Sequence, residues 1–235
     1  MAREHETGEL FVPVAQTLRE RWSCRGFLPD PAPRALIEEV LAAAQRTPSW
    51  CNTQPWRVAV ISGAALDELR QAVAADSRFG SDIPFPSGYD GVYAERRREV
   101  GYQLYDAVGV ARGDREAAAV QSLRNLDFFG APHLAVISAP AGLGPYGYVD
   151  CGLYVQSLLL AAHAAGLGTC AQAAVALKSE LLRERLGWGE DRHVVCGVSF
   201  GWPDPSHPAN SFRSRRADVA ESVAFFEEPP SSPGG

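Results

Sequence analysis

Apolar residues recur at spacings of three and four along most of this chain, a pattern typical of helices with one buried face. It predicts helices at Phe11–Arg21, Ala32–Arg46, Ala64–Ala74, Gly91–Ala111, Asp114–Phe129, Tyr148–Ala165 and Lys178–Leu186. Short runs rich in β-branched residues and bounded by Pro or Gly predict buried strands at Arg57–Ile61, His133–Ser138 and Val194–Phe200. The sequence therefore predicts a sheet flanked by helices.

Other segments depart from this pattern. Ser81–Tyr89 contains two prolines and a glycine among aromatic residues, so we expect a loop that lines or covers a pocket. Residues 227–235 are rich in Glu, Pro, Ser and Gly, which predicts a disordered tail after a single domain of residues 1–226. The most apolar stretch, Val149–Gly168, is interrupted by Asp150 and His163, which favours a buried helix over a membrane span.

The composition narrows the class of ligand. The 235 residues are 46% hydrophobic and 21% charged, and the net charge of −6 disfavours a general binder of nucleic acids or anionic membranes. Five scattered cysteines without a Cys-x-x-Cys pair predict reduced thiols and a cytoplasmic protein, and the charged N-terminus does not fit a secretory signal. The histidines show no metal-ligand spacing, so we expect no metal.

Two basic clusters lie near opposite ends of the chain. Arg21-Trp22-Ser23-Cys24-Arg25 follows the first predicted helix, and Asn210-Ser211-Phe212-Arg213-Ser214-Arg215-Arg216 follows the last predicted strand. Guanidinium groups and a hydroxyl can surround a phosphate with fixed donors. The alternative is an ordinary solvated turn for the first cluster and a solvated basic tail for the second.

Two further clusters carry polar or small residues between core elements. Thr47–Trp56 has the sequence Thr-Pro-Ser-Trp-Cys-Asn-Thr-Gln-Pro-Trp, and its amide side chains suit recognition of a heterocycle, although Pro, Ser and Asn also simply end helices. Gly166–Ala174 has the sequence Gly-Leu-Gly-Thr-Cys-Ala-Gln-Ala-Ala. Its start is an ordinary helix end, and the small residues after it would let backbone N–H groups approach a flat ligand.

Taken in order, these clusters resemble the nitroreductase family of FMN enzymes. The family pattern is an Arg-x-Ser-x-Arg start, a Pro-Ser-x-x-Asn-x-Gln-Pro-Trp segment, a Gly-Leu-Gly-x-x-x-Gln segment, then Gly-x-x-x-Gly-x-Pro-Asp with a closing Asn and Arg. This chain has Gly197–Asp204 for the last motif, and the resemblance extends from Arg21 to about Phe226. It implies an α+β fold of three layers, with a central, mostly antiparallel sheet flanked by helices, in an intertwined homodimer with shared active sites.

The resemblance also implies roles for individual residues. Around the FMN phosphate and the pyrimidine edge of the flavin it places Arg21, Trp22, Ser23, Arg25, Arg213 and Arg216, with Arg25 at the pyrimidine edge. The segment that reaches the flavin of the partner subunit would contain Pro48, Ser49, Trp50 and Asn52. The backbone facing the flavin N5 edge would be that of Ala171, Gln172 and Ala173. Candidate walls of the substrate pocket are Trp50, Phe85, Phe128 and Phe129, with core packing as the alternative for the phenylalanines.

An enzyme of this kind would take hydride from NADH or NADPH at flavin N5 and pass electrons to nitroaromatic, quinone or related small acceptors by a ping-pong mechanism. The flavin carries out the redox chemistry, so no side-chain nucleophile is sought. Arg25 would stabilise negative charge near N1 and O2 of the flavin. Trp50 and Cys51 stand where many relatives carry small residues, so the indole would narrow the pocket. The choice between NADH and NADPH, and the physiological acceptor, stay open.

Three alternatives stay open as well. A non-catalytic module that binds or senses FMN would make the same contacts. Gly142–Gly147 matches the Gly-x-Gly-x-x-Gly loop of NAD-dependent dehydrogenases, although no acidic residue follows within Gly166–Leu177. Gly197–Gly201 matches the Gly-x-Ser-x-Gly turn of serine hydrolases, although Trp202 and Pro203 stand where a helix should begin.

Overall fold

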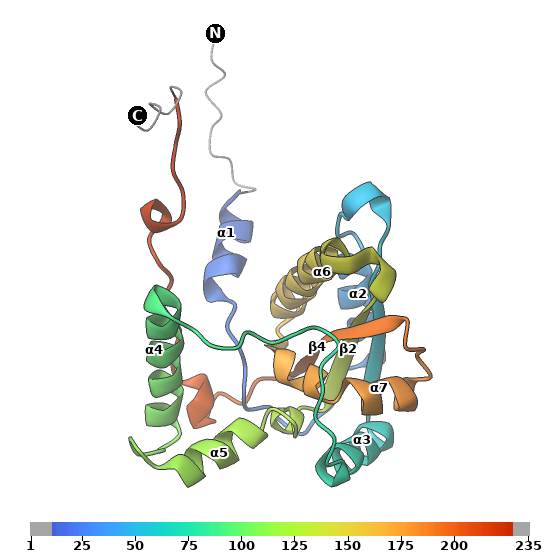
Figure 1. Cartoon of the computed structure of the whole chain (residues 1–235). Coiled ribbons are helices and arrows are strands. Elements are labelled where there is room, and N and C mark those ends of the chain that lie inside the picture. The colour runs from blue at the N-terminus through green and yellow to red at the C-terminus, as the bar shows by residue number, and fades with distance from the viewer. Residues whose placement is uncertain (1–10, 228–235) are drawn as a thin grey trace.

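The computed structural model describes residues 11–227 of the chain. Its helices are α1 Phe11–Glu20, α2 Arg34–Ala44, α3 Ala64–Ala75, α4 Gly91–Ala107, α5 Arg115–Leu123, α6 Gly144–Ala164 and α7 Ser179–Leu186 (Figure 1). Its strands are β1 Arg57–Ser62, β2 His133–Pro140, β3 Gly168–Gln172 and β4 Arg192–Gly201. Every helix and strand that the sequence predicts is present, although several ends are shifted.

The strands form one sheet in the order β1-β2-β4-β3, and every neighbouring pair is antiparallel. One row of paired residues crosses the whole sheet, running from Val60 through Ala135 and Val198 to Ala171. β1 and β3 are therefore the two edges, and β2 and β4 are buried in the middle. This arrangement confirms the predicted, mostly antiparallel sheet.

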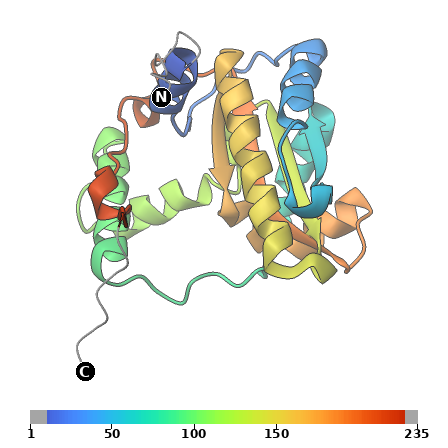
Figure 2. The same ribbon diagram turned by 90° about the horizontal axis from the view of Figure 1, so that it is seen from above.

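Helices cover both faces of the sheet. α2 and α6 pack on one face, where Ile37 and Tyr154 belong to the same cluster as Ala135 of β2. α3 and α7 pack on the other face, where Leu69 and Leu182 join the neighbouring residues of β2. Successive side chains of a strand point to opposite faces, so one strand supplies both cores. The three layers are visible in Figures 1 and 2 and confirm the predicted fold class.

α4 and α5 stand apart from these layers (Figure 2). Neither helix contains a buried residue within the described chain. The predicted loop Ser81–Tyr89 leads to α4 and forms neither helix nor strand. It is fixed near its start by Asp82, whose carboxylate pairs with Arg183 and accepts a hydrogen bond from the backbone N–H of Val194 at 2.8 Å. An isolated helix gains most of its stability from a packed face, so α4 leaves a surface that can pack on something else.

Three predicted helix ends are wrong for local reasons. α4 ends at Ala107 rather than Ala111, because Gly109 takes a φ of +76° and breaks the helical path. The predicted helix Asp114–Phe129 ends at Leu123, and the left-handed Phe128 and Phe129, with φ of 55° and 54°, turn the chain into β2. α6 begins four residues early, at Gly144, because Pro145 is tolerated in a first turn where its missing N–H breaks no hydrogen bond. The strand β3 was not among the predicted strands.

The dehydrogenase alternative is wrong. Gly142–Gly147 spans the 3₁₀ turn Ala141–Leu143 and the first turn of α6. A dinucleotide-binding loop requires a parallel β-α-β unit. β2, which precedes the loop, pairs antiparallel with both of its neighbours.

Some expectations fall partly or wholly outside the described residues. The predicted tail lies there from residue 228 onward, as do residues 1–10 of the predicted domain, so both extents stay predictions. Within residues 11–227, no helix is long and apolar enough to cross a membrane. The same residues contain no group of three His, Cys, Asp or Glu side chains that could hold a metal ion.

Candidate functional site

The segment after α1 is laid along the open edge of β3. Ser23 forms a parallel bridge with Thr169, and the backbone N–H of Cys24 donates to the Thr169 carbonyl at 2.8 Å. The approach is close because Gly168 has no side chain: a Cβ there would lie 2.7 Å from the Cys24 Sγ. The first basic cluster is thereby fixed at the edge of the sheet.

Asn210 ties the same segment to the loop after β4. Its Oδ1 accepts from the backbone N–H of Arg25 at 2.9 Å, and its Nδ2 donates to the carbonyls of Gly26 and Asp204, both at 2.8 Å. The side chain is buried, with 7% of its surface exposed. In the sequence Asn210 is only one member of the second basic cluster, and nothing in its pattern indicates that it joins the two clusters.

The two basic clusters meet at this point. The Arg213 guanidinium stacks over the Trp22 ring at 4.1 Å, and it donates to the Asn210 carbonyl at 2.8 Å. Burial lowers the pKa of Arg21 from its ordinary value, and the positive charge of nearby Arg216 lowers it further. Arginines from opposite ends of the sequence thus face one another.

These arginines lack acidic partners. Among the described residues, no carboxylate lies within 4.0 Å of Arg21, Arg25, Arg213 or Arg216, whereas nine ion pairs occur elsewhere. The Trp22 Nε1 is also buried without a hydrogen-bond partner in this part of the chain. In a protein of net charge −6, such a concentration of uncompensated donors is suited to an anion.

The edge of β3 beside the arginines offers free backbone groups. The carbonyl of Thr169 points outward to Cys24, and alternation along a strand directs the N–H and C=O of Ala171 to the same outer edge. The side chains of Ala171 and Ala173 are exposed, whereas that of Gln172 is buried. Burial raises the pKa of Cys170 on this strand, with the charges of Arg25 and Arg21 opposing the shift.

The side chain of Gln172 serves the fold. Its Nε2 donates to the carbonyl of Asn125 at 2.8 Å, and its Oε1 accepts from Ser199 Oγ. Ser199 lies inside β4 with 0% of its surface exposed. The hydrolase alternative is therefore wrong, because a nucleophilic serine must stand exposed on a sharp turn.

The second cluster is held in a strained turn. The backbone N–H of Trp50 donates to Asp150 Oδ1 at 3.1 Å, and Ser49 Oγ accepts from the N–H of Gln54 at 2.9 Å. Cys51, Asn52 and Gln54 take φ values of 51°, 56° and 45°, which cost energy in residues other than glycine and are concentrated at functional sites. Asp150, which in the sequence is only an interruption of an apolar run, is the buried anchor of this turn.

The strained turn does not lie with the arginines in one chain. Asp150, near the start of α6, holds Trp50, whereas Trp22 packs edge-on against His163 at the end of the same helix, with ring centroids 5.9 Å apart. At about 1.5 Å per residue, the thirteen residues from Asp150 to His163 span about 20 Å. The structure therefore gathers Arg21, Ser23, Arg25, Arg213 and Arg216 beside Ala171, and places Pro48–Asn52 at the far end of α6.

The aromatic pocket candidates have different surroundings. Phe85 is 44% exposed in the loop before α4, and Trp50 is 62% exposed and packs against Tyr146 at 4.8 Å. Phe129 is buried, with the Arg25 guanidinium 5.9 Å above its ring. Phe128 packs in the core beneath α3, which is the alternative that the sequence left open for it.

This geometry defines a class of protein: a three-layer α+β protein in which arginines without acidic partners among the described residues gather at an open edge of the sheet, an arrangement suited to an anionic ligand. Comparison with known proteins makes the identification specific. The profile described as "Nitroreductase family" matches residues 18–202, so the chain belongs to the nitroreductase family. This confirms the family assignment made from the four motifs.

Individual relatives agree with this assignment. The chain is 36% identical over 223 residues to nitroreductase NfnB of Mycolicibacterium smegmatis, covering 93% of this chain and 95% of the relative. It is 33% identical to nitrobenzene nitroreductase of Ectopseudomonas oleovorans over 92% of this chain and 97% of the relative. The fold matches the crystal structure of FMN-dependent NfnB from Mycobacterium smegmatis in complex with NADPH, with a TM-score of 0.88, 36% identity and coverage of 93% of this chain and all of that one.

Proposed function

We propose that this chain is an FMN-dependent oxidoreductase that passes electrons from NAD(P)H to nitroaromatic, quinone or related small acceptors. The observation that carries the proposal is the meeting of Arg21, Arg213 and Arg216 beside the open edge of β3, with no carboxylate of the described residues within 4.0 Å of any of the three. The NfnB structure from Mycobacterium smegmatis is that of an FMN-dependent nitroreductase in complex with NADPH. The NfnB structure from a Sphigopyxis strain is that of an FMN- and NADPH-dependent nitroreductase.

The residues present fit FMN. Arg21 and Arg216 repel each other in the absence of an anion, and a phosphate between them would relieve that repulsion and gain charge-assisted hydrogen bonds. Ser23 adds a hydroxyl at the same edge, and Arg213 is held nearby by its stacking on Trp22. We therefore assign the FMN phosphate to Arg21, Ser23, Arg213 and Arg216.

Bound FMN supplies the two-electron chemistry that side chains lack. The protein binds and orients it, and tunes its electrostatics. The backbone N–H of Ala171 faces the outer edge of the sheet and has no hydrogen-bond partner among the described residues, and Arg25 provides a fixed positive charge that favours negative charge at the pyrimidine edge. Arg25 is kept in place by Asn210 on its backbone and by the Phe129 ring under its guanidinium.

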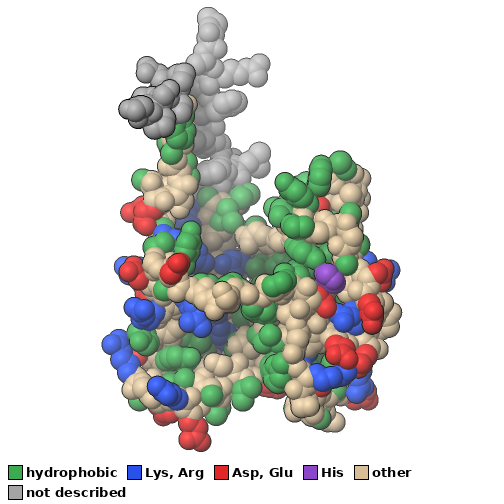
Figure 3. All heavy atoms as spheres, in the orientation of Figure 1, with side chains coloured by type: hydrophobic (Ala, Val, Ile, Leu, Met, Phe, Trp, Pro, Cys, Tyr) green, Lys and Arg blue, Asp and Glu red, His purple; other side chains and the backbone are tan. Residues whose placement is uncertain are grey.

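The separation of the two halves of the site supports a homodimer with shared sites. The helix residues that hold the Trp50 turn and Trp22, Asp150 and His163, lie about 20 Å apart along α6, and a second copy could bring such a turn to the ligand at the arginines. The exposed residues Tyr146, Val149 and Leu153 form an apolar stripe on α6, and Figure 3 shows apolar side chains gathered over this end of the molecule. Contiguous apolar surfaces of this kind mark protein contacts.

The class of acceptor is proposed from the relatives, which include nitrobenzene, chloronitrobenzene and 4-nitrobenzoate reductases. The exposed Trp50 indole gives this chain its own pocket shape, which a panel of acceptors of different width would measure. We also propose a cytoplasmic location, because all five cysteines are free.

The test is the absorbance spectrum of the purified protein before and after NADPH, followed by nitrobenzene, 4-nitrobenzoate and menadione. We expect a yellow dimer that is bleached by NADPH and recovers its colour with an acceptor. A yellow protein that NADPH does not bleach would instead be a flavin-binding or flavin-sensing module. A colourless monomer that does not take up FMN would refute the proposal.

A further inference from the structure

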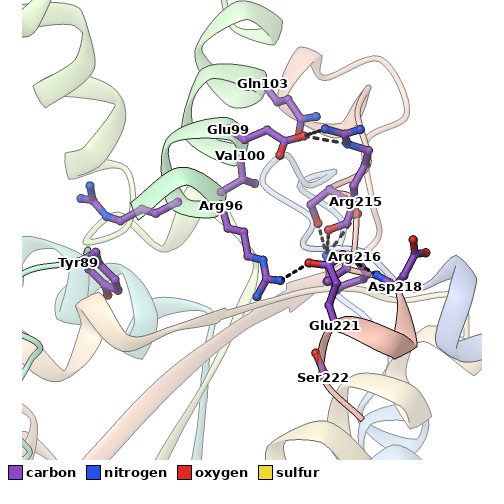
Figure 4. Close-up of a pocket in the computed structure, with 13 residues that line it drawn as sticks. Tyr89, Arg96, Glu99, Val100, Gln103, Arg215, Arg216, Asp218, Glu221 and Ser222 are labelled. Carbon is purple, nitrogen blue, oxygen red and sulfur yellow. Dashed lines mark hydrogen bonds and ion pairs between the residues drawn. The ribbon is translucent and has the colours of Figure 1, made fainter. Parts of the chain in front are cut away.

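A second site adjoins the flavin-phosphate arginines. A groove of about 1070 Å³ lies between α4 and the segment of residues 214–222, and it is lined by Tyr89, Arg96, Arg97, Gln103, Arg215 and Arg216, among others (Figure 4). One of the proposed FMN ligands, Arg216, lines this groove. Its other residues have no part in the proposed flavin site.

Most of the charge in this groove is internally neutralised. Arg96 pairs with Glu221 at 3.2 Å and Arg215 pairs with Glu99 at 2.7 Å, as the dashed lines in Figure 4 show. The remaining acid, Asp218, caps the 3₁₀ turn Val219–Glu221 with its side chain. These pairs hold α4 against the C-terminal segment, and their carboxylates are already satisfied.

Two arginines of the groove are left in excess. No carboxylate of the described residues lies within 4.0 Å of Arg97 or Arg216. Arg216 donates only to neutral oxygens, including Ser214 Oγ at 2.7 Å. Arg97 lies over the Tyr89 ring at 5.3 Å, which orients the guanidinium and leaves its N–H groups without an acceptor in this part of the chain. An open cavity with two uncompensated guanidinium groups is a site for a phosphate.

The position of the groove restricts which phosphate it can bind. Arg216 is close enough to Arg21 for its charge to lower the pKa of Arg21, so the groove opens next to the proposed FMN phosphate. Arg97 lies on α4 over the Tyr89 ring, and Figure 4 shows Tyr89 on the opposite side of the groove from Arg216. A ligand that reaches Arg97 while its reactive end lies at the flavin must be long and must carry a phosphate far from that end.

We infer that Arg97, oriented by Tyr89, binds the phosphate on the adenosine ribose of NADPH and makes this chain prefer NADPH to NADH. The inference rests on the proposed function and names the electron donor for that site. NADH lacks this phosphate and carries a hydroxyl in its place, so the guanidinium loses a charge-assisted hydrogen bond with NADH but keeps every other contact. The donor preference is thus set on α4, outside the flavin-phosphate cluster.

The test compares three variants of the flavin-loaded protein. Arg97→Ala should lower kcat/KM for NADPH by about tenfold, mainly through KM, and change kcat/KM for NADH by less than about twofold, because one charge-assisted hydrogen bond is lost. Arg97→Lys keeps the charge and should recover part of the NADPH preference. Arg98→Ala is the matched control, since Arg98 is exposed on the same helix and does not line the groove.

A binding measurement separates this role from catalysis. In isothermal titration calorimetry, adenosine bearing 2′- and 5′-phosphates should bind the unaltered protein more tightly than adenosine 5′-monophosphate, and Arg97→Ala should abolish the difference. The inference is overturned if Arg97→Ala remains active with an unchanged NADPH-to-NADH ratio. It is also overturned if that variant loses FMN, because Arg97 would then belong to the flavin site. Failure of the unaltered protein to oxidise either nucleotide would refute the proposed function itself.

Discussion

Replacing Asn210 by alanine removes the side chain that joins the two ends of the sequence at the flavin-phosphate site. Three hydrogen bonds are lost, to the backbone groups of Arg25, Gly26 and Asp204, in a place where only 7% of the Asn210 surface is exposed. Each buried backbone group left without a partner costs about 1–3 kcal/mol, and water will hydrate some of these groups. We therefore expect the free energy of unfolding to fall by about 2–4 kcal/mol.

The assay is urea unfolding at one protein concentration, first without added FMN and then with FMN in large excess. A ligand at 100 times its Kd stabilises the folded state by about 2.7 kcal/mol. Since Asn210 also positions the backbone of Arg25, we expect the variant to show a smaller stabilisation by FMN as well as a lower starting stability. The two effects distinguish a positioning residue from a purely structural one.

Ser211→Ala provides the control, because Ser211 is the exposed neighbour and only its backbone N–H is bonded, to the carbonyl of Pro208 at 3.0 Å. Its stability should stay within about 0.5 kcal/mol of the unaltered protein. If Asn210→Ala behaved like Ser211→Ala, both in stability and in FMN binding, the reasoning about this contact would be refuted.

The remaining predictions concern other parts of the molecule. Arg25→Ala should weaken FMN retention or slow reduction by NADPH. Ser199→Ala should keep most activity and lower the free energy of unfolding by about 1–2 kcal/mol, because the buried Oε1 of Gln172 loses its donor. Flavin content and stopped-flow absorbance check both variants, and equal, complete loss of activity in the two would contradict the assignment. Asp150→Ala should release the Trp50 turn, which the proposed dimer brings to the partner's flavin, and should lower both FMN retention and turnover of nitroarenes, measured by flavin content and steady-state assays; unchanged values of both would contradict the role of the turn. Burial lowers the pKa of His133, which the folded protein keeps neutral as an acceptor for the Ala32 N–H at 2.9 Å. In the unfolded chain this imidazole binds a proton below its ordinary pKa near 6.5, whereas in the folded protein it stays neutral to a lower pH. The free energy of unfolding should therefore be highest above that pH and should fall as the pH drops below it. Melting curves at several pH values should show a weaker pH dependence for His133→Gln than for the unaltered protein.

The sequence by itself determined the local elements, the chemistry of the ligand and the family. Apolar spacing located each helix and the strands β1, β2 and β4, because these periods report which face of an element is buried. Strand β3 was harder to predict because Gly168–Gln172 is made of small and polar residues without an alternating pattern. The four motifs indicated a phosphate and a flat ring, since arginine, hydroxyl and exposed backbone groups have this chemistry wherever they are brought together.

Only the tertiary structure decided how these parts are combined. Asn210 stabilises the site through backbone groups of distant residues, and every residue has such groups, so the sequence carries no sign of the contact. Phe128 and Phe129 are adjacent and chemically identical, yet Phe128 packs in the core and Phe129 lies beneath Arg25, because both take left-handed φ values that turn the chain sharply at this point. The 20 Å between the Trp50 turn and the arginines, and the groove beside Arg97, likewise depend on how α6 and α4 are placed on the sheet. Local sequence patterns specify the secondary structure and the ligand chemistry of each segment, and long-range packing specifies which segments meet in one site.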